Sequence, residues 1–191
     1  RRRVARGADH HAATPALVSA LAYREGTEYV EVDAGSYDIA IAPAGGTPVG
    51  AVLTVEDLAL EADKKYTAVA YGELASLQAL ALEDADMTAA ADQIKIRAIH
   101  AAAAVGEVDI WNLPAQGEPG LLYENVPFGG VGGYLDLPAQ AYTLGIDVDN
   151  DAAPDLVFSL PALPGGTIAN VFAVSDAEGV ALIAQLQTGA P

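Results

Sequence analysis

The chain has 191 residues, of which 52% are hydrophobic and 18% charged, and its formal net charge is −17 at pH 7. This apolar content is enough for packed cores and excludes a wholly disordered chain. The absence of cysteine excludes disulfides, thiolate metal sites and cysteine nucleophiles. No apolar run approaches the roughly 20 residues that a membrane-spanning helix needs, so we expect no membrane insertion.

The start of the chain differs in charge from the rest. Four of the nine basic residues stand there: Arg1, Arg2, Arg3 and Arg6. Residues 7–191 hold five basic side chains against twenty-six acidic ones. That balance repels nucleic acid, so we expect no nucleic-acid partner. It also predicts that the basic arm steers association with the acidic face of a neighbouring molecule.

Alternation of apolar and polar residues with a period of two predicts a series of short strands. These strands are expected at residues 29–32, 37–41, 52–60, 66–71 and 77–82. Turns containing glycine, proline or aspartate separate them. Short strands at this spacing indicate an all-β sandwich or barrel.

The second half of the chain repeats the first. The aromatic residues Tyr23, Tyr29 and Tyr37 recur as Phe128, Tyr134 and Tyr142, at a constant offset of 105. Residues 66–70 correspond to residues 168–172, at an offset of 102. A period of about 100 residues indicates tandem domains, because the units of a solenoid are much shorter.

We therefore predict two tandem immunoglobulin-like β-sandwich domains. The first copy is placed at residues 1–83, an acidic linker at 84–93 and the second copy at 94–191.

Tyrosine recurs just after a turn at the start of expected strands, at Tyr37, Tyr66 and Tyr142. Such a ring can pack on a core while its hydroxyl bonds a carbonyl of the turn, as in the tyrosine corner of immunoglobulin-like domains. We expect Tyr37 to superpose on Tyr142 between the copies. Tyr29 should superpose on Tyr134, and all of these side chains should be mostly buried.

The start of the second copy resembles a known family. Residues 94–101 read I-K-I-R-A-I-H-A, and residues 108–112 read V-D-I-W-N. These phrases are similar to the opening of bacterial domain-of-unknown-function family 4397, in which a V-R-x-x-H-A strand precedes a V-D-hydrophobic strand. Residues 58–72 and 134–142 resemble later phrases of the same family. The resemblance implies an immunoglobulin-like fold, tandem copies and a secreted or cell-surface location in bacteria, and it implies no activity.

The first copy departs from this pattern. His100 stands 28 residues before Phe128, whereas only 22 residues precede Tyr23. That stretch contains no recognisable matching strand pair. We therefore expect the first copy to be atypical at its N-terminus and one of its sheets to lack a strand.

His100 and Asp109 are a candidate binding pair. Asp109 could lie on the strand adjacent to His100 and accept its ring N–H, and a nucleophile nearby would then make a catalytic base. No nucleophile-elbow serine motif occurs. A histidine satisfied by Asp109 or by a turn is the favoured interpretation, and no catalytic residue is assigned.

Four aspartates lie close together between two expected strands: Asp147, Asp149, Asp151 and Asp155. Carboxylates at alternate positions of a turn can converge on calcium, which takes about six to eight oxygen ligands. The loop lacks the glycine and the closing glutamate of an EF-hand, so a solvated, empty hairpin tip is the favoured interpretation and a calcium site is the alternative. Calcium is the single cofactor that the sequence suggests.

Trp111 and the glycine-rich residues 129–133 carry weaker signals. An exposed Trp111 would suit stacking on carbohydrate, whereas a buried one would fill the core, and we expect burial. The glycines are not followed by a predicted helix, as a phosphate loop requires, so we expect a flexible turn.

The favoured function is a non-catalytic extracellular structural or adhesive module that self-assembles through strand or arm exchange. Its expected partners are copies of itself or other surface proteins, with residues 16–21 able to add a strand to an open sheet edge. A carbohydrate- or calcium-binding surface module is the alternative. A hydrolase built around His100 ranks third.

Overall fold

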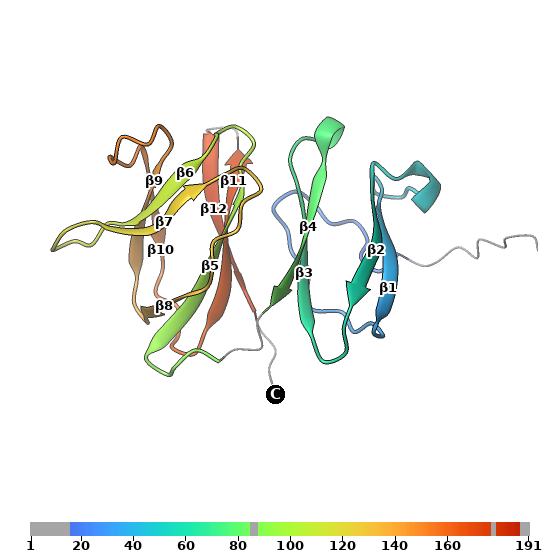
Figure 1. Ribbon diagram of the computed structural model, residues 1–191, viewed down its shortest axis with the longest axis horizontal. Coiled ribbons are helices and arrows are strands. Elements are labelled where there is room, and N and C mark those ends of the chain that lie inside the picture. Colours follow the sequence, from blue (N-terminus) through green and yellow to red (C-terminus); the bar gives the residue numbers. More distant parts are fainter. Residues whose placement is uncertain (1–15, 85–87, 177–178, 188–191) are drawn as a thin grey trace, which may run out of the picture.

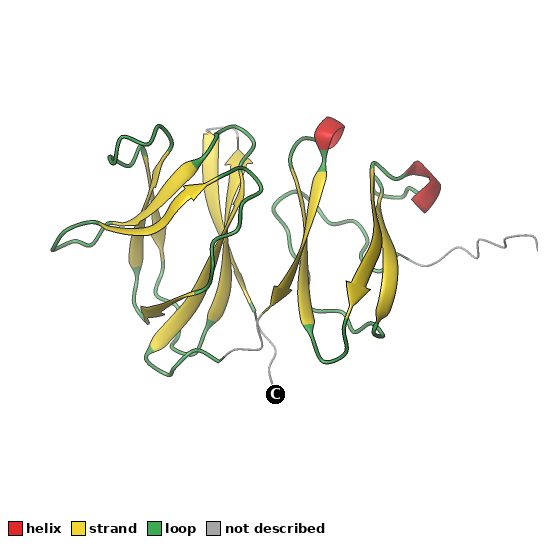
Figure 2. Cartoon of the chain, in the orientation of Figure 1, coloured by secondary structure: helices red, strands yellow, loops and turns green. Residues whose placement is uncertain are grey.

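The computed structural model describes residues 16–84, 88–176 and 179–187, and it is almost entirely β (Figures 1 and 2). The described residues form twelve strands and two short 3-10 turns, η1 (Pro48–Gly50) and η2 (Leu74–Ser76). No helix in this part of the chain is long and apolar enough to cross a membrane. The predicted all-β sandwich class is confirmed.

Residues 93–186 form a sandwich of two four-stranded sheets. One sheet has the order β10-β9-β6-β7 and the other β12-β11-β5-β8. The strands are β5 (Gln93–Ala101), β6 (Val108–Asn112), β7 (Gly120–Val126), β8 (Leu135–Pro138), β9 (Tyr142–Asp147), β10 (Leu156–Leu160), β11 (Ile168–Asp176) and β12 (Gly179–Leu186). β5 and β6 are central strands, one in each sheet, and β5 runs parallel to β11.

Alternating apolar residues of both sheets meet in the core of this sandwich. Ile94, Ile96 and Ala98 of β5 are 0%, 2% and 4% exposed, and they pack in two clusters with residues of β9 and β11. Burying one isoleucine side chain stabilises the fold by about 1.5–3 kcal/mol. Tyr123 is buried in the same core, and its hydroxyl donates to the carbonyl of Ile96 at 3.1 Å.

Residues 35–84 form two separate hairpins. β1 (Gly35–Ile41) pairs only with β2 (Leu53–Leu60), and β3 (Lys65–Tyr71) pairs only with β4 (Gln78–Asp84) among the described residues. These four strands confirm those predicted at 37–41, 52–60, 66–71 and 77–82. Within residues 16–84 the buried side chains are Tyr71 and Asp84.

The strand predicted at residues 29–32 is wrong, because these residues lie outside every strand. The predicted burial of Tyr29 is also wrong, since its side chain is 39% exposed. The physical reason is the lack of a pairing strand. In the sandwich, the equivalent β8 is held by its antiparallel pairing to β5, and no strand of the described chain takes that place beside residues 29–32.

The hairpin β3–β4 packs against the sandwich formed by residues 93–186. In Figure 1 the hairpin β3–β4 stands between the sheet β12-β11-β5-β8 and the hairpin β1–β2. Thr67 and Tyr71, which share one face of β3, both contact the sandwich: Thr67 at Asn170 and Tyr71 at Phe128. Asp84, placed in the predicted linker, is the last residue of β4 and takes part in the same interface.

Candidate functional site

The acidic loop between β9 and β10 brings three aspartates together. One carboxylate oxygen from each of Asp147, Asp149 and Asp151 lies within 4.8 Å of the others. Asp147 is fully buried and accepts hydrogen bonds from the backbone N–H groups of Asn150 and Ala152, both at 2.8 Å. Asp147 therefore shapes the loop, and the exposed Asp149 and Asp151 remain able to meet a cation.

The fourth predicted ligand, Asp155, lies outside this group of three. Its carboxylate accepts a hydrogen bond from the N–H of Val148 at 2.9 Å, which closes the base of the loop. Repulsion by Asp151, followed by burial and by the charges of Asp155 and Asp147, raises the pKa of Asp149 above its ordinary value. Mutual repulsion of this kind is what a bound cation would relieve.

His100 and Asp109 do not meet. β5 and β6 belong to different sheets, and the His100 Nε2 lies 2.6 Å from the carbonyl of Gly106. Its Nδ1 accepts from the N–H of Ala102 at 3.3 Å. Asp109 accepts instead from the N–H of Asn125 at 2.6 Å. The predicted pairing with Asp109 is therefore wrong, and the alternative, a histidine bonded to a turn, is confirmed.

The environment of His100 favours its neutral form. The side chain is 1% exposed. Burial is the main cause that lowers its pKa, opposed in part by the hydrogen bond to Gly106. A neutral histidine with both ring nitrogens engaged by backbone groups positions the turn after β5.

Trp111 is neither fully buried nor fully exposed. Its residue is half-buried on β6, and its Nε1 is shielded from solvent without a hydrogen-bond partner among the described residues. The predicted burial is met only in part, because Trp111 is one of the last residues of β6 and the core clusters do not include it. No group of the described residues bonds the indole Nε1, so Trp111 gives no support to the carbohydrate-binding alternative.

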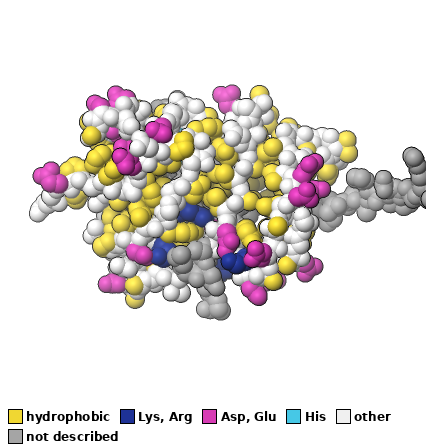
Figure 3. Space-filling view, in the orientation of Figure 1, with side chains coloured by type: hydrophobic (Ala, Val, Ile, Leu, Met, Phe, Trp, Pro, Cys, Tyr) yellow, Lys and Arg dark blue, Asp and Glu magenta, His cyan; other side chains and the backbone are white. Residues whose placement is uncertain are grey.

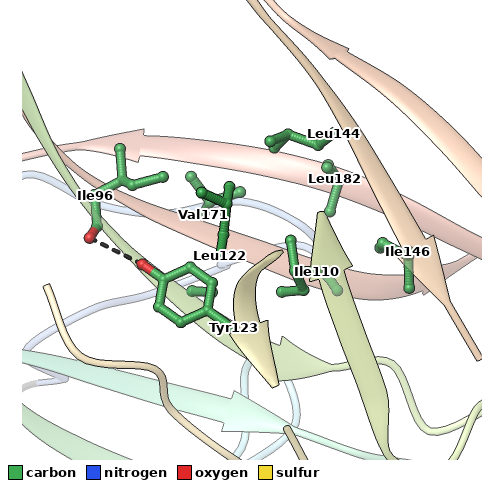
Figure 4. Close-up of a pocket in the computed structure, with 10 residues that line it drawn as sticks. Ile96, Ile110, Leu122, Tyr123, Leu144, Ile146, Val171 and Leu182 are labelled. Carbon is green, nitrogen blue, oxygen red and sulfur yellow. Dashed lines mark hydrogen bonds between the residues drawn. The ribbon is translucent and has the colours of Figure 1, made fainter. Parts of the chain in front are cut away.

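The cavity inside the sandwich offers no reactive group. Figure 4 shows Ile96, Ile110, Leu144 and other apolar side chains around it, with Tyr123 as the one polar residue of the lining. The Tyr123 hydroxyl is engaged with Ile96, and burial raises its pKa above the ordinary range. This cavity is a packing feature of the core.

The glycine-rich segment runs beside β5. Gly129 has φ +78° and donates its N–H to the carbonyl of His100 at 2.7 Å. The N–H of Gly132 donates to Ala98 at 2.9 Å. No helix follows among the described residues, and the segment predicted as a flexible turn is instead held along β5 by these backbone bonds.

A buried polar network joins the hairpin β3–β4 to the sandwich, and sequence patterns did not indicate it. The Arg97 guanidinium donates to Asp84, to the carbonyl of Glu83 and to Asn170, and it stacks 4.7 Å above the ring of Tyr134. Asp84 also accepts from Tyr29, Thr67 and Gln187. The sequence features that could have suggested this ion pair are the aspartate at the end of β4 and the arginine within β5.

The remaining surface is acidic and exposes apolar strands. Figure 3 shows acidic side chains spread over one face, with basic ones gathered near its centre. The apolar faces of β1 and β2 are only half-buried, at Tyr37, Ile39, Ile41, Leu53, Val55, Leu58 and Leu60. The predicted assembly residues Arg1, Arg2, Arg3 and Arg6 lie outside the described residues, and residues 16–21 lie outside any strand.

A family model matches the chain. Residues 5–111, more than half of the chain, match the family described as domain of unknown function (DUF4397). The match covers both hairpins and continues through β5 and most of β6. No curated protein matches the chain.

Proposed function

The chain belongs to the DUF4397 family, and we propose that it is a non-catalytic structural or adhesive module of the bacterial exterior, acting through open strand edges. The observation that carries this proposal is the pair of two-stranded hairpins, β1–β2 and β3–β4. Their equivalents in the sandwich are extended by further strands, whereas these two are unextended in the described chain.

Open edges of this kind are binding sites for other strands. An unpaired strand edge presents a row of N–H and C=O groups that a second chain can pair with. The half-buried Ile39 and Ile41 of β1 place apolar surface beside that edge. Backbone pairing would supply affinity, and the apolar face would fix which side of an added strand turns inward.

The arrangement of titratable groups supports a non-catalytic role. His100 has both ring nitrogens engaged by backbone groups. Asp109 is engaged by Asn125. A general base needs a free nitrogen or oxygen within reach of a substrate proton, and His100 offers none.

Sedimentation velocity over a range of protein concentrations tests the proposal. We expect reversible self-association that Ile39→Asp abolishes, because the charge would enter the apolar face of β1. Ala40→Asp is the matched control, since Ala40 is exposed on the other face of the same strand. A chain that stays monomeric at every concentration would count against self-association through these edges.

Calcium binding is a second candidate, favoured by the convergence of Asp147, Asp149 and Asp151. Two of these carboxylates are exposed, and the loop backbone is already held by Asp147. Calcium bound there would stiffen a hairpin tip at one end of the sandwich. A titration of this loop is described below.

A further inference from the structure

A neutral polar groove lies where β6 ends and β9 begins. It has a volume of about 490 Å³, and its polar lining residues are Asn112, Gln116, Gln140 and Thr143. Every lining residue belongs to the sandwich, so the groove does not involve the edges of the hairpins. Ligand pockets in proteins have volumes of about 300–1,000 Å³, and this groove falls within that range.

Two neighbouring strands set the distance between the walls of the groove. Asn112 is the last residue of β6, which pairs antiparallel with β9. The pairing continues for one more residue, because the N–H of Leu113 donates to the carbonyl of Thr143 at 2.8 Å. One wall is the loop after β6, which carries Gln116, and the other is the turn before β9, which carries Gln140.

The turn before β9 is tied to the sandwich at two points. The Tyr142 hydroxyl donates to the carbonyl of Pro138 at 2.8 Å, and the N–H of Ala139 donates to the carbonyl of Asp92 at 2.9 Å. The opposite wall contains Pro114, whose ring restricts the backbone. Walls that are restrained before a ligand arrives lose less conformational entropy when it binds.

The polar groups of the groove are uncharged and free to meet a ligand. No charged side chain is among the described residues that line it, although the chain has a formal net charge of −17. Asn112 and Thr143 are half-buried and Gln116 is exposed. The side chains of these three form no hydrogen bond within the described part of the chain. Such a lining fits a polar, neutral ligand, because an ionised ligand would find no opposite charge there.

We propose that this groove binds a neutral carbohydrate. A sugar hydroxyl both donates and accepts hydrogen bonds, and the carboxamides of Asn112, Gln116 and Gln140 offer donors and an acceptor together. Leu113 and Pro114 lie beside them in the lining and present apolar surface to the C–H face of a sugar ring. The inference goes beyond the proposed function, because it uses a different surface from the open strand edges.

An extended peptide fits the groove less well than a sugar. β6 and β9 are central strands in the order β10-β9-β6-β7, and each is paired on both sides. They therefore offer no open edge to which a peptide backbone could add as a strand. No aromatic ring is among the described lining residues, so affinity for a sugar rests mainly on hydrogen bonds. We expect weak binding, because each such bond contributes little net free energy in water.

The test uses the full chain labelled with ¹⁵N and, as probes, linear neutral hexasaccharides of glucose, mannose and N-acetylglucosamine. We expect at least one probe to cause saturable shifts in the side-chain NH₂ signals of Asn112, Gln116 and Gln140. Thr143→Val keeps the shape of the side chain and removes its hydroxyl, so it should weaken binding by about two- to tenfold. Thr54→Val is the matched control, because Thr54 is exposed on β2 and outside the groove, and it should leave binding unchanged.

A second groove variant and a charged probe complete the experiment. Gln116→Leu changes an exposed loop residue outside the strands, and it should weaken binding by a similar factor without altering the sheet. A hexasaccharide of galacturonic acid should not bind, because the chain is acidic and no basic residue is among those described in the lining.

Three outcomes would overturn the inference. The first is the absence of saturable shifts at the groove with every neutral probe. The second is binding that neither Thr143→Val nor Gln116→Leu weakens, or that the charged probe matches. The third is a neutral proline-rich peptide that shifts the same signals when the sugars do not, which would assign the groove to a peptide. Self-association is measured separately by sedimentation, so the proposed function stands or fails independently of these results.

Discussion

Arg97 of β5 donates from Nη2 to Oδ1 of Asp84 at the end of β4, and both side chains are buried, at 5% and 2% exposed. This ion pair joins the hairpin β3–β4 to the sandwich. A charge taken out of water is costly unless it is paired and hydrogen-bonded. Nε of Arg97 donates to Asn170 and Nη1 to the carbonyl of Glu83, so each nitrogen of the guanidinium has a partner in this interface.

We predict that Asp84→Leu loosens the hairpin from the sandwich. Leaving Arg97 buried without its partner would cost about 3–5 kcal/mol, and moving the hairpin away lets water reach the guanidinium instead. Limited proteolysis followed by mass spectrometry should show faster cleavage within residues 35–84, with residues 93–186 still intact.

The double variant Asp84→Leu, Arg97→Met removes both charges and should restore much of the resistance. Glu83→Gln is the control, because it removes only the exposed ion pair with Lys64, and exposed pairs contribute little. Equal cleavage rates in the native chain and in Asp84→Leu would contradict an energetic role for the pair.

The sequence predicted local features better than partnerships between distant segments. The turn bonds of Tyr37 and Tyr142 follow from a short phrase, and both are present. Residues 29–32 show that alternation alone does not make a strand, because a strand also needs a neighbour to pair with. The sequence places Asp84 in an acidic linker, since nothing in its local sequence indicates a bond to an arginine thirteen residues away.

Predictions about the candidate site show the same difference between local contacts and contacts between distant segments. The convergence of Asp147, Asp149 and Asp151 could be predicted because a tight turn holds all three. The separation of His100 from Asp109 could not be predicted, because local sequence does not show that their strands belong to different sheets or that each side chain bonds a backbone group instead.

Stability should depend on pH through His100. Burial lowers its pKa in the folded chain below the ordinary 6.5, so the unfolded chain binds the proton more tightly. The contribution of neutral His100 is therefore complete above about pH 6.5 and is lost as the pH falls below it, at up to about 1.4 kcal/mol per pH unit. Urea unfolding at several pH values from about 5 to 8 measures this slope.

The His100→Gln variant removes the titrating group. Its unfolding free energy will be lower overall, because the ring bonds the turn at Gly106. The informative quantity is the slope between about pH 5 and 6.5, which should be shallower than in the native chain. Parallel slopes would assign the pH dependence to other groups.

Calcium should bind at the acidic loop, and its affinity should fall at low pH. The raised pKa of Asp149 means that this carboxylate takes up a proton at a higher pH than an ordinary aspartate, and the proton competes with the cation.

Calorimetric titration of the native chain should show heat that the Asp149→Asn, Asp151→Asn variant lacks. The variant Glu118→Gln, Glu124→Gln makes the same change in charge at exposed positions outside the loop, so it should bind like the native chain. Identical traces for all three proteins would leave the loop as an unoccupied acidic hairpin tip.

Adjacent glycines should respond in opposite directions to alanine. A Cβ at Gly132 would overlap the ring of Tyr123, which is 8% exposed and held by its hydrogen bond to Ile96. The ring cannot move without disturbing the core, so Gly132→Ala should destabilise the sandwich by about 1–3 kcal/mol.

A Cβ at Gly133 would meet no atom within 4 Å, and neither glycine has a left-handed φ. Gly133→Ala should therefore be neutral or stabilise by up to about 1 kcal/mol, because alanine restricts the unfolded chain. Urea unfolding of the two variants, followed by Trp111 fluorescence, measures both changes. A Gly132→Ala variant as stable as Gly133→Ala would mean that the glycine-rich segment is not held against Tyr123.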